Sequence, residues 1–86
     1  MIEQKQLEYQ ILWDTLSINQ NKTLKLVLIN DGQNLFAAEA LTMINIKTAS
    51  IVTRCLKILS EKEILVKNGK YIIEDLFLQK WLALNV

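Results

Sequence analysis

The Asn68-Gly69 pair is the feature that most constrains the fold of this chain. Two short runs of β-favouring residues flank it, at residues 64–67 and 70–73. An Asn-Gly pair in this setting strongly predicts a β-hairpin, because both residues of a two-residue type I′ turn need a positive φ. A turn of that length places Lys67 opposite Lys70. The sequence therefore predicts a two-stranded hairpin late in the chain.

Before the hairpin, apolar residues recur with the three-to-four spacing of amphipathic helices. The first stripe consists of Tyr9, Leu12, Trp13 and Leu16, widened by Leu7 and Ile11. Ser17 then begins a Ser-x-x-Gln capping box with Gln20, which predicts the start of a second helix. Its expected inward residues are Leu24, Val27, Leu28 and Ile29. We expect that helix to end at Asp31-Gly32, because glycine adopts the left-handed conformation readily.

The middle of the chain predicts two helices joined by a short turn. Residues 33–36 favour a brief strand, and residues 37–44 favour a short helix that ends at Asn45. Thr48 or Ser50 is expected to cap the next helix, which runs to about Glu61. Its core stripe consists of Val52, Cys55, Leu56 and Leu59. Two helices in this arrangement form a helix-turn-helix.

After the hairpin, Asp75 is expected to cap a last helix with Phe77, Trp81 and Leu84 on one stripe. A helix-turn-helix followed at once by a hairpin is the plan of a winged helix. The predicted fold class is therefore α+β, mostly α, with a two-stranded wing and flanking N- and C-terminal helices. The length of 86 residues predicts a single domain over residues 1–86.

The composition argues against an enzyme. The chain has no histidine and one cysteine, Cys55, which leaves neither a Ser–His or Cys–His nucleophile nor a normal zinc site. Its two glycines, Gly32 and Gly69, are too far apart for a phosphate-binding loop. We therefore expect no catalytic residues, no metal and no cofactor.

Cell location and partner type follow from the apolar and charged content. No apolar run approaches the roughly 18 residues of a membrane span, and no secretion signal opens the chain. A lone cysteine suits a reducing compartment, so the expected location is the cytoplasm and no membrane partner is expected. The net charge is only +1, so nucleic-acid binding needs a local patch.

That patch is predicted on the second helix of the helix-turn-helix and on the wing. Such a helix commonly enters the major groove of double-stranded DNA, where an arginine such as Arg54 can read guanine and a lysine such as Lys57 can hold a phosphate. The candidate nucleic-acid-binding residues are Lys47, Ser50, Thr53, Arg54, Lys57, Lys67, Asn68 and Lys70.

A protein-binding function is the alternative. Ile51 and Ile58 lie seven residues apart on one shoulder of the same helix. They either broaden the core stripe or form a protein-contact patch. In the second case the domain is a protein-protein interaction module, and a homodimer is one form of it.

Three short motifs also carry a family resemblance. They are Leu12-Trp13 before the Ser17 helix, SIVTRCLKIL at residues 50–59, and GKYIIEDLF at residues 69–77 followed by Trp81-Leu82. The stretch from Trp13 to Leu82 resembles the C-terminal winged-helix domain of the archaeal-type AAA ATPases. Two positions depart from that pattern: Leu76 stands where the family often has proline, and Glu63 where it usually has glycine.

The resemblance implies an ATPase module upstream of this segment. It also implies that the segment is a non-catalytic module that contacts DNA or positions the ATPase on it, with residues 50–59 as the recognition helix.

Overall fold

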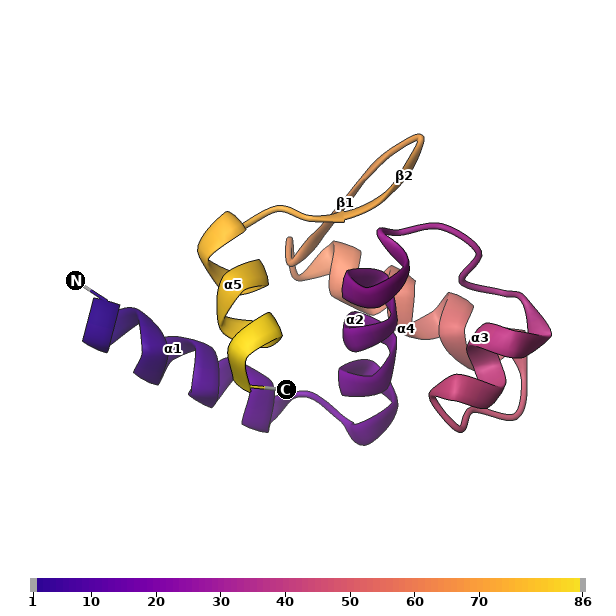
Figure 1. The fold of residues 1–86 in the computed structure, drawn as a ribbon, viewed down its shortest axis with the longest axis horizontal. Helices are drawn as coiled ribbons and strands as arrows, with labels where there is room; N and C mark the ends of the chain where they lie inside the picture. Colours follow the sequence, from indigo (N-terminus) through magenta and orange to yellow (C-terminus); the bar gives the residue numbers. More distant parts are fainter. Residues whose placement is uncertain (1, 86) are drawn as a thin grey trace.

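The computed structural model describes the backbone of residues 2–85 and the side chains of residues 6–85. Figure 1 shows α1 at one end of the molecule, α5 between α1 and α2, the wing projecting from the body, and α3 at the opposite end. The elements in chain order are α1 (Ile2–Thr15), α2 (Ile18–Asn30), α3 (Ala38–Met43), α4 (Ala49–Glu61), β1 (Leu65–Asn68), β2 (Lys70–Ile73) and α5 (Leu76–Asn85). This mostly helical fold with one antiparallel pair of strands confirms the predicted winged helix.

The core forms where α2 packs against α4. The predicted stripe of α4 is buried throughout, and on α2 the buried residues include Leu24, Leu26 and Val27. The prediction was wrong for Ile29, which is 52% exposed. Ile29 follows Val27 by two positions, a rotation of about 200° around the helix, so it lies on the side of α2 away from the buried Val27.

Local capping fixes the ends of the helices around this core. Ser17 and Gln20 form the predicted capping box, and Asp31 ends α2 in the left-handed conformation with φ 53°. Asn45 has φ 57° in the turn between α3 and α4, as predicted. Thr48 occupies the N-cap position of α4, but its hydroxyl contacts the Ser50 hydroxyl at 3.0 Å and caps no helix amide.

The expected brief strand at residues 33–36 does not form. Asn34 adopts φ 55°, which is incompatible with an extended strand. Leu35 is buried in the core, whereas Phe36 remains 49% exposed. Packing of Leu35 therefore sets the path of this segment, and the sheet consists of β1 and β2 alone among the described residues.

The hairpin forms, but its register differs from the prediction. Lys67 pairs with Tyr71 and Asn68 pairs with Lys70, which leaves only Gly69 between the strands. Gly69 has φ 77°, whereas Asn68 lacks the positive φ that a type I′ turn requires. Paired residues on the two strands point to the same face of a hairpin, and successive residues of one strand point to opposite faces. Lys67 therefore shares a face with Tyr71, and Lys70 lies on the opposite face.

The terminal helices pack through Tyr9 and Trp81. Their ring centroids are 6.2 Å apart, and the Tyr9 hydroxyl donates to Asp75 at 2.7 Å. Asp75 also accepts from the backbone amides of Phe77 and Leu78, which confirms its predicted role as the cap of α5.

Two predicted stripes on the terminal helices were partly wrong. Phe77 and Leu84 are 67% and 84% exposed, because the buried face of α5 is set by Leu78, Trp81 and Leu82. On α1, Leu7 and Ile11 are also exposed. They lie opposite the stripe that packs on the body, since one helix offers only one face to a single neighbour.

The environment of Tyr9 predicts how the stability of the fold changes at alkaline pH. Burial, followed by the hydrogen bond and charge of Asp75, raises the pKa of Tyr9 from 10.0 to about 12. The unfolded chain therefore loses this proton first, so the native state should lose stability as the pH rises from 10 towards 12. Urea unfolding across this range should show a steeper decline for the wild type than for Tyr9→Phe. Equal declines in the two proteins would show that Tyr9 is not the group responsible for the loss of stability.

Candidate nucleic-acid interface

The outer face of α4 carries the predicted DNA-reading residues. Burial of Val52, Cys55, Leu56 and Leu59 turns the opposite side of the helix to solvent. The predicted residues Ser50, Thr53, Arg54 and Lys57 are all exposed there, and Lys47 is exposed in the turn before the helix. The fold therefore brings five of the eight candidate residues onto or beside one helix.

The two cations of α4 are available for an external partner. Neither Arg54 nor Lys57 has a hydrogen bond or ion pair to another residue in the described part of the chain. Thr53, in contrast, donates its hydroxyl hydrogen to the Ala49 carbonyl at 3.1 Å. An unengaged guanidinium presents a planar fork of donors that matches guanine edges and phosphates.

The wing lysines already have partners within the molecule. Lys70 forms an ion pair with Asp31 at 2.6 Å, which ties β2 to the end of α2. The ammonium of Lys67 lies 5.3 Å from the centroid of the Tyr71 ring, a cation–π contact. Asn68 is exposed between them. The contact between Lys70 and Asp31 could not be predicted from the sequence, because the two residues are 39 positions apart.

Acidic side chains limit the positive field of this surface. Glu61 ends α4, Glu63 precedes the wing, and Glu74 follows it, all of them exposed. Glu63 adopts φ 62°, a left-handed conformation that favours glycine. These carboxylates leave the outer face of α4 as the clearest site for an anion.

The apolar shoulder predicted as an alternative site is largely covered. Ile51 and Ile58 are half-buried, and Ile51 packs against the core. The larger exposed apolar side chains instead include Leu7 and Ile11 on α1 and Phe77 and Leu84 on α5.

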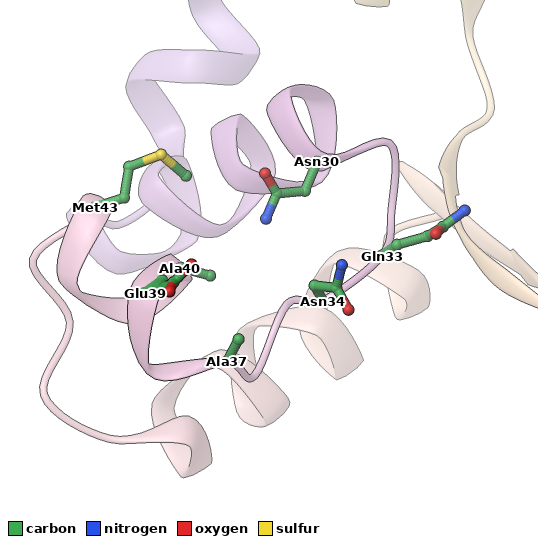
Figure 2. Close-up of a pocket in the computed structure, with 7 residues that line it drawn as sticks. All are labelled: Asn30, Gln33, Asn34, Ala37, Glu39, Ala40 and Met43. Atoms are coloured by element: carbon green, nitrogen blue, oxygen red, sulfur yellow. The ribbon is translucent and has the colours of Figure 1, made fainter.

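A polar hollow lies between the end of α2 and α3. Its volume is about 370 Å³, and Figure 2 shows Asn30, Asn34 and Glu39 around it, with Gln33 directed away. Three amides, two alanines, one methionine and one carboxylate line this hollow, and no cation does. It therefore does not extend the cationic surface of α4.

A helix-turn-helix whose second helix leads directly into a two-stranded wing defines the winged-helix class of domains. A family described as "Probable winged helix domain" matches residues 7–84, so the chain belongs to that family. A comparison with curated proteins finds no significant match, and a comparison with solved structures finds none either. Domains of this class typically act as nucleic-acid-binding or protein-binding modules and are typically non-catalytic.

The hydrophobic pattern of the helices bears on membrane association. Within residues 2–85, none of the helices combines the length and apolar character needed to cross a bilayer.

Proposed function

We propose that this domain binds double-stranded DNA through the outer face of α4, with the wing beside it. The observation that carries the proposal is the exposure of Arg54 and Lys57 on α4 without an internal partner. Lys47 adds a third exposed cation in the preceding turn. The resemblance to the C-terminal domain of archaeal-type AAA ATPases supports a wider role, in which the module positions an attached ATPase on DNA.

The proposed affinity is weak and mostly independent of sequence. Only a few phosphates can be neutralised, because Lys70 is paired with Asp31 and acidic residues surround the wing. Non-specific DNA affinities at physiological salt run from about 10⁻⁴ to 10⁻⁶ M, and we expect this domain near the weak end.

Replacing Arg54 and Lys57 together by alanine should reduce binding to a fluorescent DNA duplex by roughly tenfold or more at low salt. Each lost phosphate contact also makes the affinity less dependent on salt. Fluorescence anisotropy titrations at several salt concentrations measure both quantities. Lys25→Ala with Lys80→Ala is the matched control, because it removes the same charge from exposed positions on α2 and α5. Equal losses in the two double variants would show that net charge alone governs binding.

The second candidate function is protein contact, including dimerisation. Exposed Leu7 and Ile11 on α1, together with Phe77 and Leu84 on α5, favour it. The same preparations distinguish the two functions: absence of duplex binding at low salt, combined with self-association in sedimentation experiments, would replace the DNA proposal by this one.

A further inference from the structure

A second cleft lies between the wing and the loop that joins α2 to α3. Its volume is about 420 Å³. The lining includes two aromatic rings, Phe36 and Tyr71, and the lysines Lys67 and Lys70. Both glycines of the chain also line it. The cleft thus combines aromatic rings, positive charge and the backbone of two glycines, which carry no side chain.

The path of the loop creates this cleft. Because residues 33–36 do not form a strand, they do not pair with β2. Leu35 turns into the core and Phe36 is left 49% exposed at the cleft. Gly32 packs so closely on the Tyr71 carbonyl that the loop and the wing meet at the base of the cleft.

The chemistry of the lining suits a nucleotide better than a peptide. A peptide that added a strand to β2 would need its free edge. At that edge the Tyr71 carbonyl is covered by Gly32, and the Ile73 carbonyl accepts from Gln79 at 2.8 Å. A base, in contrast, needs an aromatic face for stacking and a cation near its phosphate.

We propose that this cleft binds one unpaired nucleotide of a DNA strand, with the base stacked on Phe36 and the phosphate beside Lys67. Lys67 supplies the cation because Lys70 is held by Asp31, and the Tyr71 ring backs the ammonium at 5.3 Å. This inference rests on the proposed DNA-binding function and extends it from duplex to single-stranded DNA. It makes Phe36 the residue that confers preference for unpaired bases.

The test compares a blunt DNA duplex with the same duplex carrying a short single-stranded thymine overhang. Stacking of one base on an aromatic side chain strengthens binding by roughly 5- to 150-fold. Because Phe36 is partly exposed, we expect the overhang to strengthen binding by about fivefold, towards the low end of that range. Phe36→Leu should abolish the gain, and Phe36→Tyr should restore it. Thermal unfolding of both variants checks that the fold is unchanged.

The outcomes separate this inference from the proposed function. Arg54→Ala with Lys57→Ala should weaken duplex binding but leave the gain from the overhang. A gain that survives in Phe36→Leu would overturn the cleft assignment, as would the absence of a gain in the wild type. Free thymidine monophosphate serves as a competitor: if it displaced the overhang at equal concentration, the site would be one for free nucleotides and the proposal of a DNA strand would fail.

Discussion

Replacing Trp81 by alanine should lower the free energy of unfolding by about 3–5 kcal/mol, as expected for truncation of a large buried aromatic side chain. Trp81 is only 7% exposed and lies on the inward face of α5 between Leu78 and Leu82. Its ring also contacts Tyr9, so the truncation would loosen the packing of α1. Urea unfolding followed by circular dichroism measures the change.

Phe77→Ala is the matched control for this prediction. It removes an aromatic ring from the same helix, but at a position that is 67% exposed. Surface substitutions usually change stability by no more than about 0.5 kcal/mol, so this variant should unfold almost as the wild type does. Equal stability of the Trp81 variant and the wild type would show that the packing of α5 does not stabilise the fold.

Gly32→Ala should destabilise the fold by about 3 kcal/mol. Gly32 adopts φ 75°, a conformation that costs a residue with a side chain roughly 1–2 kcal/mol. A methyl group at this position would also overlap the Tyr71 carbonyl oxygen. Because backbone atoms cannot rotate aside as a flexible side chain does, either α2 or the wing must move, which adds roughly 1–3 kcal/mol.

Gly69→Ala separates the two contributions. Gly69 has nearly the same φ, 77°, but apart from Gly69 itself and its two chain neighbours no atom lies within 4 Å of the added methyl group. Only the cost of holding alanine at a positive φ applies there, so the free energy of unfolding should fall by about 1 kcal/mol. If both glycine variants lost the same stability, the close approach of Gly32 to the wing would have no energetic consequence.

The solvent-exposed face of α4 was predictable because it depends on one helix alone. Once Val52, Cys55, Leu56 and Leu59 face inward, the helical period places Arg54 and Lys57 outside. The availability of the wing lysines was not predictable in this way. It depends on the ion pair of Lys70 with Asp31, a residue distant in the sequence. It also depends on the register of the hairpin, which pairs Lys67 with Tyr71 and not with Lys70.

Short-range signals in the chain specify where most elements begin and end. The capping box at Ser17, the left-handed residues Asp31 and Asn45, and the cap at Asp75 act through bonds to near neighbours, so they can be read locally. The choice of buried face is different, because it depends on which partner a helix meets. Packing against the body selected Leu26 over Ile29 and Leu78 over Phe77.

The same physical reason explains the loop and the cleft. Burial of Leu35 in the core outweighs the local strand tendency of residues 33–36, and it leaves Phe36 beside the wing. Contacts between α2, the loop and β2 cannot be inferred from the order of residues, because they form only when the helices pack and bring those segments together. Local hydrogen bonding thus gives the elements of this winged helix, and long-range burial of apolar surface decides which side chains remain exposed to bind a partner.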